Sequence, residues 1–123
     1  MRKLRLGVLK EPEGDNRVSV VPGSLKKFTK LGFEVLVEKG AGISAHHADS
    51  EYQEMGGTIT DREAAISAEI VVSISMPDVN SMSSGQILVC ISDPFRDPSG
   101  VKRAMEAGLT LLSMDMIPRR LSR

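Results

Sequence analysis

Hydrophobic and polar positions alternate along the chain between short apolar runs and segments with helical spacing. Six runs of three to six residues are rich in apolar or β-branched side chains and are bounded by glycine, proline or charged residues. This pattern is typical of strands. The predicted strands are Leu4–Leu9, Phe33–Val37, Thr58–Thr60, Ile70–Ile74, Ile87–Ile91 and Leu109–Leu112.

Helical spacing fills most of the segments between these runs. Leu25, Phe28 and Leu31 recur at three-residue intervals after Pro22, and proline is favoured in the first turn of a helix. Gly32 then offers a left-handed stop. Three further helices are predicted: Asp49–Met55, a helix capped by Asp61 that runs to Ala68, and a helix that begins at Asp97-Pro98 with Val101, Ala104 and Met105 on its apolar face.

This alternation of strands and helices predicts the fold class. Such units are joined by right-handed crossovers and form a mainly parallel sheet with helices on both faces. Solidly apolar strands also indicate burial on both faces. We therefore predict an α/β fold with a three-layer, mainly parallel, doubly wound sheet of about six strands. Ligands bind beyond the carboxyl ends of the strands in such sheets, so functional residues are expected in the loops that follow the strands.

Composition narrows the class of protein. The chain of 123 residues has the size of one domain. Its sixteen basic and sixteen acidic side chains cancel, so net charge gives no argument for binding nucleic acid or an anionic membrane. No apolar run approaches the roughly 20 residues that span a bilayer. The single cysteine, Cys90, lies in an apolar run and is expected to be buried in a protein of the reducing cytoplasm.

One loop superficially matches the dinucleotide fingerprint. Gly40-Ala41-Gly42-Ile43-Ser44-Ala45 follows a predicted strand with the spacing G-x-G-x-x-A. The fingerprint needs its last small residue inside the first turn of a helix, where N–H groups face the pyrophosphate. Helical spacing resumes only near Asp49. Glycines required by a tight loop explain this segment better.

Two arginines after predicted strands are candidates for binding an anionic group. Arg17 follows the first strand and could hold a carboxylate or phosphate through its fork of N–H donors. Its spacing equally allows an ion pair with Glu11, Glu13 or Asp15, and both interpretations stay open. Arg119 follows the sixth predicted strand directly after a proline, which helps to fix the direction of its side chain, but from the residues alone an ordinary basic terminus explains it better.

Four motifs in order give the chain a family resemblance. They are Lys10-Glu11-Pro12 followed by Asn16-Arg17-Val18, then Phe33-Glu34-Val35-Leu36-Val37-Glu38-Lys39-Gly40-Ala41-Gly42, then Gly85-Gln86-Ile87-Leu88, then Met114-Asp115-Met116-Ile117-Pro118-Arg119. Their order and spacing resemble the amino-terminal domain shared by alanine dehydrogenase and the alpha subunit of proton-translocating NAD(P) transhydrogenase.

The resemblance covers essentially the whole chain and implies its place in a larger protein. In that family this α/β lobe packs over a second, Rossmann lobe that carries the true fingerprint, and nicotinamide sits in the cleft between them. The chain ends soon after its last predicted strand. We therefore expect residues 1–123 to be a single amino-terminal domain of a two-lobe protein. The absent Rossmann lobe would supply most of the NAD site.

The resemblance favours the transhydrogenase branch. Alanine dehydrogenases resemble one another in a lysine and a histidine that handle pyruvate, and these positions are Ser73 and Asp93 here. Serine supplies no charge, and an aspartate would repel a carboxylate. We therefore expect the NAD(H)-binding component of a transhydrogenase, which transfers hydride between NADH and NADP⁺. An amino-acid dehydrogenase lobe and a non-catalytic binding module that kept the fold remain alternatives, the latter because transhydrogenases also commonly keep the lysine.

The resemblance also implies the site residues and partners. Arg119 is expected to reach the nicotinamide cleft, although an apparent one-residue insertion leaves Arg120 as the alternative equivalent. Arg17 would line the cleft, and Asp115 would orient a neighbouring arginine. No catalytic acid or base is expected in this lobe, because hydride transfer between two nicotinamides requires none. The implied partners are the Rossmann lobe, a second copy in a homodimer, and membrane transhydrogenase subunits.

Overall fold

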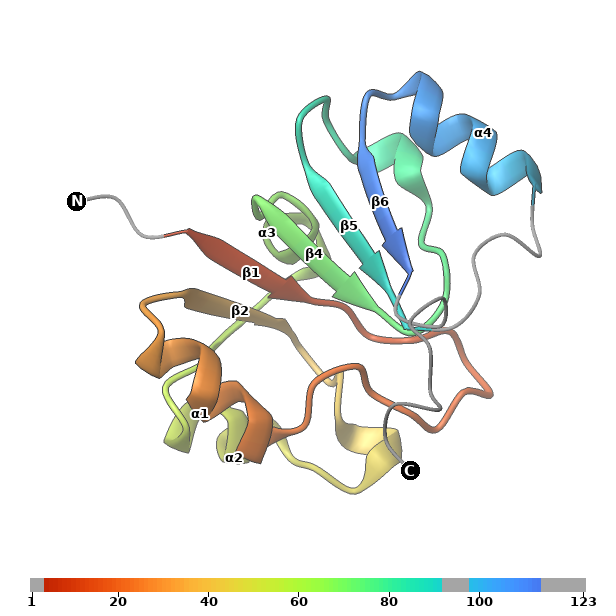
Figure 1. The fold of residues 1–123 in the computed structure, drawn as a ribbon. Helices are drawn as coiled ribbons and strands as arrows, with labels where there is room; N and C mark the ends of the chain where they lie inside the picture. Colours follow the sequence, from red (N-terminus) through yellow and green to blue (C-terminus); the bar gives the residue numbers. More distant parts are fainter. Residues whose placement is uncertain (1–3, 92–97, 114–123) are drawn as a thin grey trace, which may run out of the picture.

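The computed structural model describes residues 4–91 and 98–113, which form one six-stranded sheet with every pair of neighbouring strands parallel (Figure 1). The strand order is β3-β2-β1-β4-β5-β6, so the chain builds outward from β1 on one side and then crosses to build outward on the other. This confirms the predicted α/β class. The strands are β1 (Arg5–Val8), β2 (Glu34–Glu38), β3 (Thr58–Thr60), β4 (Ile70–Ser73), β5 (Ile87–Cys90) and β6 (Thr110–Ser113).

Helices cover both faces of the sheet and complete three layers (Figure 1). Buried side chains of α1 and α2 belong to one apolar core, and those of α3 and α4 belong to the other. Two short 3₁₀ helices were not predicted from the sequence. The helices are α1 (Pro22–Lys30), α2 (Asp49–Glu54), α3 (Arg62–Ile66), α4 (Pro98–Glu106), η1 (Ile43–Ala45) and η2 (Val79–Ser81).

The strand register explains how the two cores are separated. On β1, Leu6 and Val8 point to the α1 face, where they pair in register with Val35 and Val37 of β2. Gly7 lies between them, and a Cβ added to it would collide with the carbonyl oxygen of Ala65 at the end of α3. Only glycine therefore lets α3 pack this closely on β1.

Capping and burial test the helix predictions residue by residue. The prediction that Asp61 caps a helix is confirmed, since its carboxylate accepts a hydrogen bond from the N–H of Ala64 at 2.9 Å. The prediction that Leu31 lies on the apolar side of its helix is wrong. Helix α1 ends at Lys30, and Leu31 is 75% exposed. Met105 is likewise 71% exposed, because α4 turns its neighbour Ala104 into the core instead.

The α1 face of the sheet carries an apolar groove beside α1. Its volume is about 450 Å³, and at the edge of the same face Leu112 of β6 is half exposed. The groove is lined by Leu6, Ser19, Val20, Ser24, Phe28, Phe33, Ile70, Val72, Val89 and Ile91.

No helix within residues 4–91 and 98–113 has the length and hydropathy needed to cross a membrane.

Candidate functional site at the carboxyl ends of the strands

A pocket of about 240 Å³, lined by charged, hydroxyl and apolar side chains, lies where β1, β2 and β4 end. Strand β1 lies between β2 and β4, so this is where the direction of strand building reverses and where such sheets usually bind ligands. We call it the strand-end pocket. Its lining residues are Leu9, Lys10, Glu11, Pro12, Glu38, Arg62, Ser73, Ser75, Met76 and Pro77.

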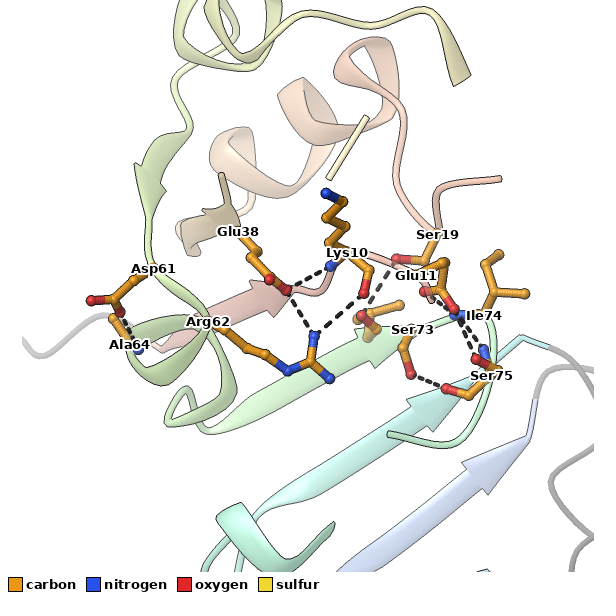
Figure 2. Close-up of polar contacts among 11 residues, drawn as sticks. Lys10, Glu11, Ser19, Glu38, Asp61, Arg62, Ala64, Ser73, Ile74 and Ser75 are labelled. Atoms are coloured by element: carbon orange, nitrogen blue, oxygen red, sulfur yellow. Dashed lines mark hydrogen bonds and ion pairs between the residues drawn. The ribbon is translucent and has the colours of Figure 1, made fainter. Parts of the chain in front are cut away.

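Glu11 links the loop after β1 to the residues that follow β4 through hydrogen bonds (Figure 2). Glu11 is 6% exposed, and its carboxylate accepts three hydrogen bonds, one from the N–H of Ile74 at 2.7 Å and two at 3.0 Å from the N–H and Oγ of Ser75. No ion pair joins Glu11 to a cationic side chain among the described residues. Backbone and hydroxyl dipoles therefore satisfy a buried negative charge, as they do in anion-binding backbone nests.

Ser73 occupies the inner side of the same pocket. It is 2% exposed, and its Oγ donates to the carbonyl oxygen of Ser75 at 2.6 Å (Figure 2). The hydroxyl proton is thus committed to the protein backbone. The site offers no ammonium group at this position, which is where the family resemblance places a lysine.

The outer side of the pocket is a compact charged network (Figure 2). One carboxylate oxygen of Glu38 accepts from the N–H of Lys10 at 2.8 Å and from Nη1 of Arg62 at 2.9 Å. The same Nη1 donates to the carbonyl oxygen of Lys10 at 3.3 Å. The network ties the ends of β1 and β2 to the start of α3. Within it, the guanidinium of Arg62 and the carboxylate of Glu38 form an ion pair.

Arg17 lies in the loop after β1, but it does not line the strand-end pocket. Its Nε and Nη2 each donate to a carboxylate oxygen of Asp15 at 2.9 Å. In this structure Arg17 therefore forms the ion pair within its own loop that its spacing allowed. The hydrogen bonds from Arg17 lower the pKa of Asp15, and they raise the pKa of Arg17. A ligand anion that used this fork would have to replace Asp15.

The other predicted cofactor-binding residues, Arg119, Arg120 and Asp115, lie outside the described residues, as does Asp93. Their placement relative to Arg17 therefore remains a prediction. The residues that the structure does bring together are Lys10, Glu11, Glu38, Arg62, Ser73 and Ser75.

The glycine-rich loop after β2 does not present a phosphate cradle. Most of its amide groups bond within the loop or to its neighbours. The N–H of Gly40 donates to the carboxylate of Asp49, and five further N–H groups donate to nearby carbonyl oxygens, those of Ala41, Ile43, Ala45, His46 and His47. A Cβ on Gly42 would lie 2.7 Å from the ring of Tyr52. The glycines therefore serve a tight turn, in agreement with the preferred interpretation of the sequence.

Two other side chains with reactive groups, Cys90 and His47, lie outside the strand-end pocket. Burial raises the pKa of the Cys90 thiol to about 11, which leaves it protonated and a poor nucleophile. His47 Nδ1 lies 3.4 Å from a carboxylate oxygen of Glu51, one turn along α2. Within the described part of the chain, no group of three or more His, Cys, Asp or Glu residues is placed to hold a metal ion.

Sequence reasoning missed Glu11 and Ser75 as site residues. The sequence presented Glu11 as a possible partner for Arg17 and as part of a family motif, although a charged residue shortly after a buried strand was the available signal. The three donors come from the far side of the sequence, 63 and 64 positions away. Only the adjacency of β1 and β4 brings them together.

Comparison with known proteins places this geometry in context. The family model described as alanine dehydrogenase/PNT, N-terminal domain, matches residues 7–123. The chain is 32% identical over 112 residues to NAD(P) transhydrogenase subunit alpha of Cereibacter sphaeroides, covering 87% of this chain and 21% of that subunit. The fold matches the crystal structure of transhydrogenase from Sinorhizobium meliloti with a TM-score of 0.87, at 29% identity and 94% coverage of this chain.

A solved L-alanine dehydrogenase is also similar, with a TM-score of 0.83, 28% identity and 89% coverage of this chain. The chain spans 36% of the transhydrogenase structure and 32% of the alanine dehydrogenase. Both matches therefore concern about a third of a longer relative.

Proposed function

This chain belongs to the alanine dehydrogenase/PNT N-terminal domain family, and from that membership we propose that it forms one lobe of the NAD(H)-binding component of an NAD(P) transhydrogenase. The complete enzyme would move hydride between NADH and NADP⁺. This lobe would close over the nicotinamide at its strand-end pocket, and a Rossmann lobe would hold the rest of the dinucleotide.

The observation that weighs against the amino-acid dehydrogenase branch is the absence of a free cation on the inner wall of the strand-end pocket, as far as its described residues go. A 2-oxo acid such as pyruvate buries a carboxylate, which needs a paired cation in a low-dielectric site. Ser73 is there instead, with its hydroxyl bonded to the backbone. Arg62 is bonded to Glu38, and the ammonium of Lys10 lies over Gly40, 3.7 Å from where a Cβ on that glycine would sit.

The residues present fit a lobe that shares a dinucleotide with another lobe. Most N–H groups of the glycine-rich loop donate within the loop or to its neighbours, which favours a pyrophosphate held elsewhere. A pocket of about 240 Å³ is smaller than the roughly 300–1,000 Å³ of sites that enclose whole ligands, and it suits a single ring. When bound, the nicotinamide supplies the hydride. The contribution of this chain is to orient the ring and to exclude water.

The proposal extends to partners and to residues outside the described ranges. Arg119 would reach the nicotinamide region, with Arg120 as the alternative, Asp115 would orient the arginine, and Arg17 would line the cleft. The relative in Cereibacter sphaeroides is named as a transhydrogenase alpha subunit. As the family resemblance implies, the complete protein would form a homodimer and associate with membrane subunits.

A second candidate is the lobe of an amino-acid dehydrogenase. The similarity to L-alanine dehydrogenase at a TM-score of 0.83 supports it. The pocket without a free inner cation weighs against it, because the oxo-acid carboxylate would lack a charged partner.

Substitution of Arg119 tests the site assignment in the complete, assembled enzyme. We expect Arg119→Ala to lower the rate of hydride transfer from NADH to NADP⁺ by at least about tenfold, as loss of a positioning group does. The thermal unfolding midpoint should stay within about 2 °C of the parent value, because the proposed role of Arg119 is to position the ligand and not to stabilise the fold. Arg120→Ala is the matched control. If only Arg120→Ala slows the reaction, Arg120 is the equivalent residue, and if neither does, the assignment is wrong.

A further inference from the structure

Arg62 has hydrogen-bond donors that the charged network leaves unused. A guanidinium carries five N–H donors, and in Arg62 only Nη1 is bonded, to the carboxylate of Glu38 and the carbonyl oxygen of Lys10. Nε and Nη2 donate to no residue within the described ranges. Because 44% of the Arg62 side chain is exposed and Arg62 lines the strand-end pocket, a ligand can reach these donors.

The residues that hold Arg62 determine its direction and compensate its charge. Figure 2 shows the guanidinium between Glu38 and Ser73, with Nη1 turned towards Glu38 and the ammonium of Lys10 pointing away from it. The ion pair with Glu38 balances the charge of Arg62. A ligand anion would also meet the carboxylate of Glu11 in the same pocket. The unused donors therefore suit a neutral acceptor, such as a carbonyl oxygen.

The remaining wall of the pocket suits the face of a small ring. Four of its lining residues carry neither a charge nor a polar side-chain group apart from one thioether, and a thioether makes favourable contacts with aromatic rings. Apolar walls with a few placed polar groups are typical of sites for small organic ligands. These four residues are Leu9, Pro12, Met76 and Pro77.

We propose that Arg62 binds the carbonyl oxygen of the nicotinamide carboxamide through Nε or Nη2, and that it thereby orients the ring in the strand-end pocket. This assignment rests on the proposed function, because it names the group of the dinucleotide that this lobe recognises. Arg62 takes no part in the hydride transfer itself. A ring that lacks an acceptor oxygen at this position loses the hydrogen bond and binds more weakly.

The experiment titrates three pyridines into the 123-residue chain, at a pH where all three are uncharged, and follows the Nε–H signal of Arg62 and the backbone amides by NMR. Nicotinamide should bind saturably. 3-Acetylpyridine keeps the carbonyl oxygen and should bind within about twofold of nicotinamide. 3-Methylpyridine has no acceptor there and should bind at least about fivefold more weakly, as the loss of one hydrogen bond predicts.

Arg62→Lys separates ligand binding from the ion pair. Lysine keeps a cation for Glu38, but its one nitrogen replaces Nη1 and leaves no second nitrogen for the ligand. We therefore expect nicotinamide to bind at least about fivefold more weakly, with the affinity for 3-methylpyridine unchanged. Arg103→Lys makes the same change at an exposed residue of α4 outside the pocket and should alter neither affinity.

Three results would overturn the proposal: wild-type pocket signals that do not respond to nicotinamide, full nicotinamide affinity in Arg62→Lys, or equal losses of nicotinamide and 3-methylpyridine in that variant. Should Arg62→Lys not fold, the ligand series on the wild-type chain decides, and equal affinities for nicotinamide and 3-methylpyridine refute the assignment. Hydride transfer is assayed separately. A pocket that binds nicotinamide in an inactive complete enzyme refutes only the proposed function, and an active enzyme with an unresponsive pocket refutes only the role of Arg62.

Discussion

At the scale of single residues, Tyr52 shows how one side chain can join separate segments. It is fully buried, and its hydroxyl donates to the carbonyl oxygen of Val20 at 2.8 Å, so α2 is tied to the segment that precedes α1. Its ring also packs against Gly42 in the loop after β2. Burial raises the pKa of Tyr52 to about 12.

Titration of this tyrosine is directly measurable, because the chain has one tyrosine and no tryptophan. The neutral phenol is favoured in the folded state, so the unfolded state loses its proton first, near pH 10. The free energy of unfolding should therefore decrease as the pH rises from 10 towards 12. We expect phenolate absorbance to appear together with the loss of circular dichroism. Ionisation near pH 10 in a chain that is still folded would show that the hydroxyl is accessible.

The ion pair between Arg5 and Glu69 gives the opposite dependence on pH. Hydrogen bonds from the side chain and backbone of Arg5 lower the pKa of Glu69 from 4.5 to about 2. The stabilisation is therefore present above pH 4.5 and is lost as the pH falls towards 2. About a third of each side chain is exposed, so we expect Glu69→Gln to cost no more than about 1 kcal/mol at pH 7. The difference from wild type should vanish near pH 2 in urea unfolding, and a difference that persists there would exclude this ion pair as its source.

At the scale of secondary-structure elements, the sheet depends on close contacts that only glycine allows. Gly7 of β1 faces the carbonyl oxygen of Ala65, whereas a Cβ on Gly23 in α1 would meet no neighbouring atom within 4 Å. Substitution by alanine should therefore have opposite effects on stability at these two positions.

We expect Gly7→Ala to destabilise the chain by about 3 kcal/mol, because the backbone of α3 must move away from β1. Gly23→Ala should stabilise it by about 0.5 to 1 kcal/mol, since alanine costs less conformational entropy in a helix. Chemical unfolding of both variants measures the difference. Equal effects of the two substitutions would mean that β1 and α3 are not in this close contact.

Most elements were predictable from sequence because their signals are local. Apolar runs, the Asp61 cap and the first-turn Pro22 each report on their own segment, and all six strands formed where they were predicted. The predicted burial of Leu31 and Met105 was wrong, because periodicity does not show where a helix ends or which side of it faces the sheet. The 3₁₀ helices η1 and η2 have too few residues to show a period.

At the scale of the whole molecule, the site arises from the order of the strands. Glu11 and Ser75 become neighbours because β1 pairs with β4, and Glu38 meets Arg62 because α3 follows β3 back across β1 and β2. The sequence predicted the correct edge of the sheet, since ligand sites of parallel sheets lie beyond their carboxyl ends. It could not predict which loop residues would meet, because that depends on contacts between residues 63 and 64 positions apart.

The central claim is that this lobe serves hydride transfer between nicotinamide nucleotides and not oxo-acid chemistry. The most direct measurement replaces the matching lobe of the Cereibacter sphaeroides transhydrogenase alpha subunit with this chain and assays the assembled complex. We predict that NADH reduces NADP⁺ with a rate loss of less than about a hundredfold, the scale expected for small misplacement of reacting groups. Pyruvate with ammonium should give no oxidation of NADH. An assembled chimera that oxidises NADH with pyruvate, and passes no hydride to NADP⁺, would contradict the account.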